Sequence, residues 1–125
     1  MSQTILLVED NQDNQTIYRV ILEHYGYRVL VAGDGERGVA VACETLPDAI
    51  LMDVSIPIID GHQATRILKA EASTAHIPII ILTAHAMAED RASAFECGGD
   101  GFITKPAEPR RVAEEIRRVL AGTAG

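Results

Sequence analysis

The stretch Ala49-Ile50-Leu51-Met52-Asp53 decides the fold, because four apolar residues run without a break into a single carboxylate. A continuous apolar run, rather than an alternating one, is typical of a strand buried on both faces of a parallel sheet. Similar short runs recur at Ile5–Val8, Val29–Val31, Ile79–Leu82 and, more weakly, Gly101–Ile103. The sequence therefore predicts five parallel strands, with Asp53 at the end of the third.

Helical periodicity fills the segments between these runs. Apolar residues three and four positions apart predict the buried face of each helix. Asp34 is suited to cap the second helix, and Pro109 to begin the last. The predicted buried residues are Ile17, Val20, Ile21 and Tyr25, then Val39, Ala42, Cys43 and Leu46, then Ala64, Ile67 and Leu68, a weaker set over 88–97, and Val112, Ala113, Ile116, Val119 and Leu120. Right-handed crossovers between these units predict an open α/β, doubly wound five-stranded parallel sheet with helices on both faces.

Length and composition limit the number of domains and the classes of partner that we expect. A chain of 125 residues suits a single domain over 1–125, with a core over about 4–120. The formal net charge of −7 argues against nucleic acid and anionic membrane surfaces as partners, since these need clustered Lys and Arg. No membrane span or signal peptide is recognisable, so we expect a cytoplasmic protein. Cys43 and Cys97 are expected to be small buried residues rather than a disulfide.

Polar residues follow the strands, at the edge where open α/β sheets bind ligands. They are Glu9 and Asp10, Asp53, Thr83 and Lys105. Three neighbouring carboxylates repel one another unless a cation lies among them, and Mg²⁺ prefers oxygen ligands. Glu9, Asp10 and Asp53 are therefore the candidate Mg²⁺ ligands. The backbone carbonyl near Ser55 is a further candidate.

Two more groups add chemistry to this cluster. Lys105 brings a positive charge, and Thr83 a hydroxyl donor, toward the carboxylate of Asp53. A cation, an ammonium and a hydroxyl around one carboxylate favour phosphoryl transfer onto it, because they neutralise the charge on the phosphoryl oxygens. The sequence therefore predicts Asp53 as a nucleophile that forms an acyl phosphate.

At these strand ends the chain resembles the receiver domain of bacterial response regulators, including stand-alone chemotaxis-type members. Four motifs carry the resemblance: Leu7-Val8-Glu9-Asp10-Asn11, Met52-Asp53-Val54-Ser55-Ile56-Pro57 with Asp60-Gly61, Ile81-Leu82-Thr83-Ala84, and Phe102-Ile103-Thr104-Lys105-Pro106. The resemblance extends from Thr4 to about Leu120. It implies a flavodoxin-like sheet of strand order 2-1-3-4-5. It also implies a phosphoacceptor in a two-component phosphorelay rather than an enzyme that turns over external substrates.

The resemblance assigns roles in the acidic pocket. Asp53 matches the phosphorylated aspartate, and Glu9 and Asp10 match the acidic pair that holds Mg²⁺. Ser55 matches the position whose backbone carbonyl completes the metal shell. Ser55 and His85 also occupy two positions that tune phosphate lifetime in the family.

The resemblance also implies a switch and its partners. Thr83 matches the hydroxyl that turns toward the phosphoryl group, and Phe102 the switch aromatic, which is often Tyr. Lys105 matches the lysine that contacts a phosphoryl oxygen, and the Lys105-Pro106 bond is expected to be cis. The donor would be a sensor histidine kinase or a histidine phosphotransfer protein. A downstream protein would bind the face formed by the fourth helix, fifth strand and fifth helix.

Other interpretations remain open at this stage. A phosphohydrolase of the haloacid-dehalogenase type needs a second acid two residues after the nucleophile, where Ser55 stands. A nucleotide or flavin carrier needs a phosphate-binding loop, but the residues after the first strand are Glu9–Asp13. A receiver unit from a larger hybrid kinase is a further alternative, although Met1 and the short tail favour a complete small protein. The four arginines of the last helix form either a solvated face, partly paired with Glu114 and Glu115, or a partner-binding face. They are Arg110, Arg111, Arg117 and Arg118.

Overall fold

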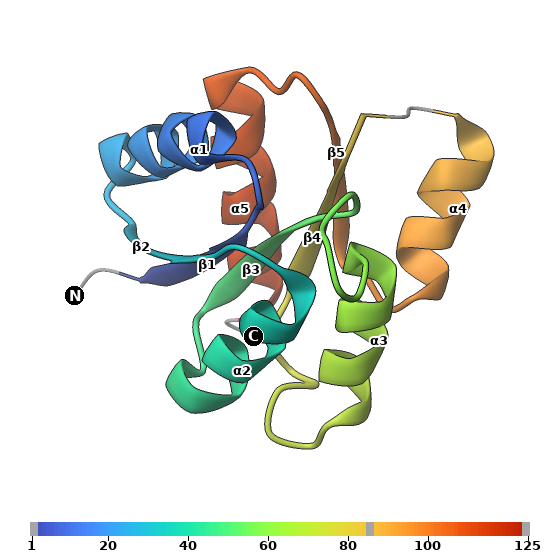
Figure 1. Ribbon diagram of the computed structural model, residues 1–125. Helices are drawn as coiled ribbons and strands as arrows, with labels where there is room; N and C mark the ends of the chain where they lie inside the picture. Colours follow the sequence, from blue (N-terminus) through green and yellow to red (C-terminus); the bar gives the residue numbers. More distant parts are fainter. Residues whose placement is uncertain (1–2, 85–86, 124–125) are drawn as a thin grey trace.

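Strands and helices alternate along the chain in the computed structural model, which describes residues 3–84 and 87–123 (Figure 1). All five predicted strands are present, and each is followed by a helix. The strands are β1 (Thr4–Val8), β2 (Arg28–Ala32), β3 (Ala49–Asp53), β4 (Ile79–Thr83) and β5 (Gly101–Thr104). The helices are α1 (Gln12–His24), α2 (Gly35–Thr45), α3 (Gly61–Ala70), α4 (Ala88–Glu96) and α5 (Pro109–Thr123).

The sheet is parallel and has the order β2-β1-β3-β4-β5, which confirms the predicted topology. The strand order reverses beside β1, because the chain moves first to β2 and then back across β1 to β3. Leu7 pairs with Leu51 in β3, and Met52 pairs with Ile81 in β4. This register aligns the carboxyl ends of the three central strands, so the residues that follow them share one edge.

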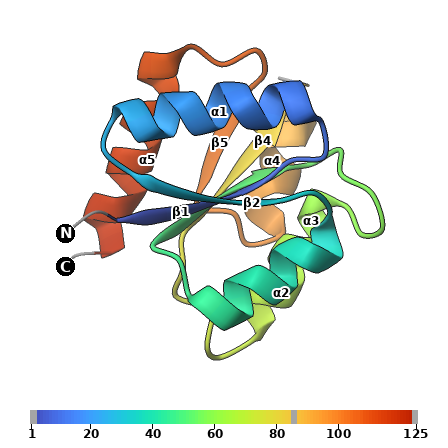
Figure 2. The ribbon, with the colours of Figure 1, turned by 60° about the vertical axis from the view of Figure 1, so that its left-hand side comes forward.

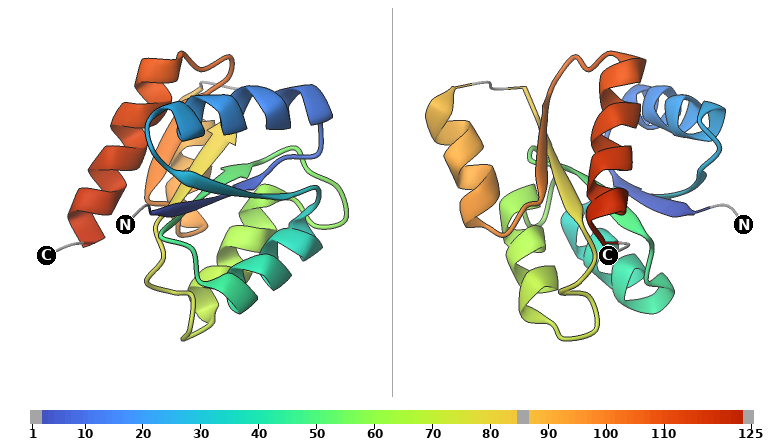
Figure 3. Two further views of the ribbon diagram at one scale, coloured as in Figure 1. Left: turned by 90° about the vertical axis from the view of Figure 1, so that its left-hand side faces the viewer. Right: turned by 180° about the vertical axis from the view of Figure 1, so that it is seen from behind.

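Helices cover both faces of the sheet, as predicted. One face packs against α1 and α5, and the other against α2, α3 and α4 (Figures 2 and 3). Successive residues of a strand point to opposite faces: Ile5 and Leu7 belong to the cluster under α1 and α5, whereas Leu6 and Val8 belong to the other cluster. Burial on both faces explains why the strands are continuously apolar.

The predicted buried face of α1 is wrong except at Ile21, which is buried. Ile17 is 52% exposed and Val20 57% exposed, whereas Tyr18 and Leu22 are buried beside Ile21. The helix carries two apolar stripes that share Ile21, and contact with the α5 side of the core selects the second stripe. The exposed pair therefore forms an apolar surface on α1.

Cys43 is also misassigned, because it is exposed, whereas Cys97 is buried as expected. In α2, Ala42 faces the core as predicted, together with Gly38. A Cβ added at Gly38 would lie 2.9 Å from a methyl of Val8, so the helix approaches β1 too closely for a larger residue there. Leu46 and Ile67, likewise predicted to be buried, are exposed.

Helix boundaries follow the expected signals. The Asp34 side chain accepts a hydrogen bond from the Arg37 N–H and caps α2, and α5 begins at Pro109. The predicted buried residues of α5 are all buried: Val112, Ala113, Ile116, Val119 and Leu120. No helix within 3–84 and 87–123 is long and apolar enough to cross a membrane.

Candidate functional site

Three carboxylates meet at the carboxyl edge of β1 and β3. One oxygen from each of Glu9, Asp10 and Asp53 lies within 4.8 Å of the other two. Glu9 and Asp53 are buried, with 0% and 2% of their surface exposed, whereas Asp10 is exposed. The sequence-predicted acidic cluster therefore exists, and Asp10 lies on its solvent side.

Lys105 provides the cation of this cluster. Its Nζ atom lies 2.5 Å from Oδ2 of Asp53 and 3.4 Å from Oε1 of Glu9. Its backbone N–H donates to the carbonyl of Thr83 at 2.6 Å, which continues the pairing of β5 with β4. The bond from Lys105 to Pro106 is cis, as the resemblance implied. One ammonium thus pairs with two of the three clustered carboxylates, and the cluster keeps a net negative charge.

The pKa values of Glu9 and Asp53 shift in opposite directions. Burial, and then the neighbouring Asp53, raise the pKa of Glu9 to about 7, although Lys105 acts in the opposite direction. Burial also opposes ionisation of Asp53, but contacts with the Glu9 carboxyl, the Lys105 ammonium and the Ser55 N–H hold its pKa below the usual value. Asp53 therefore stays ionised more readily than the neighbouring Glu9.

The backbone around Asp53 is fixed by the start of α3. The Ser55 N–H donates to Oδ1 of Asp53 at 3.0 Å. The Gly61 N–H donates to the Val54 carbonyl at 3.0 Å, and a Cβ added at Gly61 would lie only 2.3 Å from the carbonyl oxygen of Asp53. Asp60 caps the helix in a capping box with Gln63. The sequence motifs include Gly61 but predict no role for it, although its position directly after a helix-capping aspartate is a signal of a tight helix start.

Thr83 and Phe102 lie on neighbouring strands. Thr83 is buried at the end of β4 and pairs in register with Thr104 of β5. Phe102 is buried on β5, and the guanidinium of Arg91 from α4 lies 5.9 Å from the centroid of its ring. These positions link the site edge to the side of the sheet covered by α4. The His85 prediction falls outside the described residues.

The acidic cluster fits a divalent cation. Among the residues that the structure describes, Oε2 of Glu9 is a buried oxygen with no hydrogen-bond partner. A buried acceptor without a donor is costly unless a water molecule or an ion satisfies it. Three converging carboxylates, one of them open to solvent, match the oxygen ligands and retained waters that Mg²⁺ favours.

A doubly wound sheet in this order, with an acidic pocket and a lysine at its carboxyl edge, defines a phosphoacceptor signalling domain. The family model of the response regulator receiver domain matches residues 5–117, and the chain belongs to this family. Receiver domains accept phosphoryl groups in two-component signalling and bind Mg²⁺ at the acidic pocket.

Relatives and solved structures agree with this assignment. Protein PilH of Pseudomonas aeruginosa is 37% identical over 94% of this chain and 98% of its own length. The polar-differentiation response regulator DivK of Brucella ovis is 34% identical over 96% and 98%. The receiver domain of the sensor histidine kinase PA1611 from P. aeruginosa, solved with a magnesium ion in its active site cleft, has a TM-score of 0.90 at 38% identity, covering 97% of this chain and 99% of that one. Chemotaxis protein CheY4 of Vibrio cholerae has a TM-score of 0.89 at 25% identity, covering 95% and 99%.

Proposed function

We propose that residues 1–125 form a single receiver domain whose phosphoacceptor is Asp53. The observation that supports this most strongly is the environment of its carboxylate. Asp53 is buried between an ammonium and two further carboxylates, and its own pKa is held low. Ionised, oriented oxygens are what nucleophilic attack on phosphorus requires.

The proposed reaction joins a carboxylate oxygen of Asp53 to phosphorus while the phosphorus–nitrogen bond to the donor histidine breaks. The histidine nitrogen keeps the bonding electron pair, and Asp53 becomes an acyl phosphate. Lys105 moves from the Asp53 oxygen that it now contacts to an oxygen of the phosphoryl group. Thr83, at the end of β4, donates its hydroxyl to another phosphoryl oxygen.

Glu9, Asp10 and Asp53 would hold Mg²⁺, together with the backbone carbonyl of Ser55. When bound, the ion neutralises charge that builds up on the phosphoryl oxygens. Asp10 is exposed and so stays accessible to the entering ion, whereas the buried Glu9 supplies the orphaned oxygen.

The donor is proposed to dock over α1. A hollow of about 340 Å³ beside Lys105 is lined by Ile17, Tyr18 and Pro106. Ile17 and Val20 extend this surface as exposed apolar residues one helical turn apart. A sensor histidine kinase or histidine phosphotransfer protein that covered this surface would bring its histidine to the mouth of the site.

We propose that α4, β5 and α5 form the surface that binds the downstream protein. A cavity of about 740 Å³ between these elements is lined by Arg91, Phe102 and Arg111, among others. Movement of Thr83 toward the phosphoryl group would free space for Phe102, and the altered face would bind a downstream protein. We propose neither nucleic acid nor a membrane as a binding partner.

Turnover of external substrates is not part of the proposal either. The position two residues after Asp53 is Ser55, which cannot act as the general acid that a phosphohydrolase of the haloacid-dehalogenase type uses. Ser55 is short and exposed, so we propose that it leaves the phosphoryl group open to water. We also propose that the protein is cytoplasmic, as expected from the sequence.

Mass spectrometry tests the acceptor. Wild type treated with acetyl phosphate and Mg²⁺ should gain the mass of one phosphoryl group, and Asp53→Asn should gain none. Asp60→Asn is the matched control, because asparagine caps a helix as well as aspartate does. It should keep the gain. An undiminished gain in Asp53→Asn would show that the acceptor lies elsewhere.

A further inference from the structure

Glu115 of α5 is a buried carboxylate that the acidic pocket does not use. It is 6% exposed. Its Oε1 accepts from Arg118 Nε at 2.5 Å, and its Oε2 accepts from the Phe102 N–H at 3.3 Å and from Arg111 Nη2 at 3.4 Å. Burial raises its pKa, but the Arg118 guanidinium, the Phe102 N–H and Arg111 outweigh burial and hold that pKa below 4.5. Both oxygens of a charged group are therefore committed to partners.

These partners lie along the free edge of the sheet. β5 is an edge strand, so within the described part of the chain the N–H and C=O groups that point away from β4 face no further strand. For Phe102 both groups are satisfied from α5: Glu115 accepts from its N–H, and Arg111 Nη2 donates to its C=O at 3.2 Å. Arg118 Nη2 also donates to the Asp100 C=O at 2.7 Å. Side chains of one helix thus take the place of a sixth strand at Phe102.

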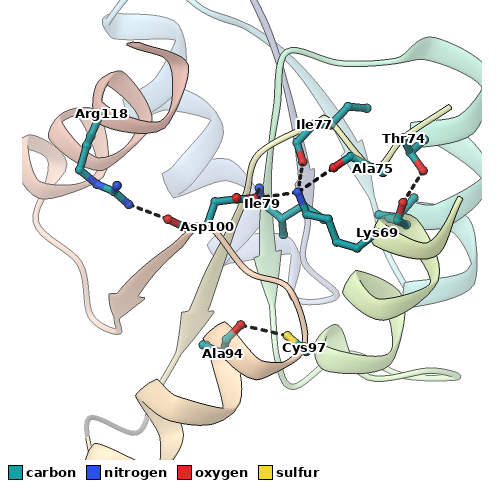
Figure 4. A network of polar contacts seen from close by, with 10 residues as sticks. Lys69, Thr74, Ala75, Ile77, Ile79, Ala94, Cys97, Asp100 and Arg118 are labelled. Atoms are coloured by element: carbon teal, nitrogen blue, oxygen red, sulfur yellow. Dashed lines mark hydrogen bonds and ion pairs between the residues drawn. The ribbon is translucent and has the colours of Figure 1, made fainter. Parts of the chain in front are cut away.

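The beginning of β5 is held from the other side as well. The Asp100 carboxylate accepts from the Ile79 N–H at 2.9 Å and pairs with Lys69 of α3 at 2.8 Å, as Figure 4 shows beside the Arg118 contact. Lys69 is itself anchored on the carbonyls of Ala75 and Ile77. The strand that carries Phe102 is consequently fixed between α3 and α5.

We propose that Glu115 is a positioning residue that holds the backbone of Phe102 in the arrangement with the free Asp53 carboxylate. This inference rests on the proposed function, in which Phe102 responds to phosphorylation. The arrangement is that of the free carboxylate because Lys105 contacts Asp53 Oδ2 directly. A shift of β5 at Phe102 would take the Phe102 N–H away from Oε2 of the buried Glu115 and leave that oxygen with the longer Arg111 contact, which disfavours the shift. Glu115 thereby opposes the change that a phosphoryl group on Asp53 favours.

The test compares Glu115→Gln with Glu114→Gln, the neighbouring exposed glutamate of the same helix. Amide hydrogen exchange at Phe102 and beryllofluoride affinity in Mg²⁺ are measured by NMR. In Glu115→Gln we expect Phe102 exchange to accelerate about tenfold, and beryllofluoride to bind roughly threefold to tenfold more tightly, because a charge-assisted bond to the resting arrangement is lost. Arg118→Gln alters an exposed side chain and should shift both readouts in the same direction. It replaces Glu115→Gln as the test variant if Glu115→Gln folds poorly. Glu114→Gln should change neither.

The outcomes separate this inference from the proposed function. If wild type gives no beryllofluoride response at the site, the proposed function fails and this inference with it. If wild type responds, but Glu115→Gln and Arg118→Gln keep the wild-type affinity, Glu115 is merely structural and only this inference is overturned. Unchanged Phe102 exchange in both variants would overturn it as well.

Discussion

The Nζ atom of Lys105 lies 2.5 Å from Oδ2 of Asp53 and so joins the carboxyl ends of β3 and β5 across the intervening β4. The same ammonium is 3.4 Å from the buried Glu9. A residue that follows an edge strand therefore places a positive charge against the carboxylates at the centre of the sheet. This relationship makes the site sensitive to the lysine charge.

Replacing Lys105 by methionine keeps most of its apolar stem and removes its charge. We expect the rate of phosphorylation by acetyl phosphate to fall roughly 10²-fold, because one of the groups that neutralise the phosphoryl oxygens is lost. The other lysine of the chain, Lys69, pairs with Asp100 and supplies the control. Lys69→Met should phosphorylate at close to the wild-type rate, and equal rates in the two variants would contradict the role of Lys105.

Gly61→Ala tests the close approach of α3 to the acceptor. The added Cβ would lie 2.3 Å from the Asp53 carbonyl oxygen and 2.8 Å from Val54 Cα, so the backbone must move. We expect unfolding by urea to show a loss of about 1–3 kcal/mol, together with slower phosphorylation. At Gly33 nothing lies within 4 Å, so Gly33→Ala should change neither quantity greatly. Equal stabilities of the two variants would exclude the proposed crowding.

Ile58 is strained in the loop that leads to α3. It is 69% exposed and has φ 76°, a left-handed conformation that β-branched residues avoid. Asparagine tolerates this conformation, so Ile58→Asn should stabilise the protein by about 1 kcal/mol. The measurement is the free energy of unfolding in urea. Ile67→Asn on the exposed side of α3 is the comparison and should bring no gain; stabilisation there but not at Ile58 would refute the strain.

The lowered pKa of Glu115 leads us to expect that the stability of the protein depends on pH. Its pKa in the folded protein lies below 4.5, so the unfolded state binds the proton more readily. The stabilisation is therefore present above pH 4.5 and is lost as the pH falls through the folded value. We expect Glu115→Gln to cost about 1–3 kcal/mol near pH 7 and progressively less below pH 4.5. Glu114→Gln, at an exposed position of the same helix, should cost little stability near pH 7, and a constant cost of Glu115→Gln at every pH would contradict the assignment.

Much of the fold could be predicted because the central strands are buried on both faces. Continuous apolar runs such as Ala49–Met52 have few other interpretations, and the residues that follow them converge once the strands are parallel. The rotation of a surface helix is less constrained. In α1, periodicity alone did not distinguish the stripe with Ile17 from the stripe with Tyr18, and tertiary packing decided between them.

The remaining features depend on distances that no local pattern encodes. The sequence predicts Glu115 only as a partner of the arginines of α5, and the pairs with Arg111 and Arg118 are present. Its burial depends on how α5 lies against the edge of β5, which no local pattern shows. The crowding at Gly61 likewise arises only when α3 starts directly over Val54. The unpaired oxygen of Glu9 likewise depends on the tertiary structure, because Lys105 contacts Oε1 of Glu9 and leaves Oε2 without a hydrogen-bond partner among the described residues.

Chemical mapping of the phosphorylated residue tests the central claim most directly. Borohydride reduces an acyl phosphate of aspartate to homoserine, so wild type treated with acetyl phosphate and Mg²⁺ can be reduced, digested and sequenced by tandem mass spectrometry. The account predicts homoserine at position 53 alone, and its disappearance when Mg²⁺ is chelated. Homoserine at another aspartate, or an undiminished yield at position 53 without the metal, would contradict it.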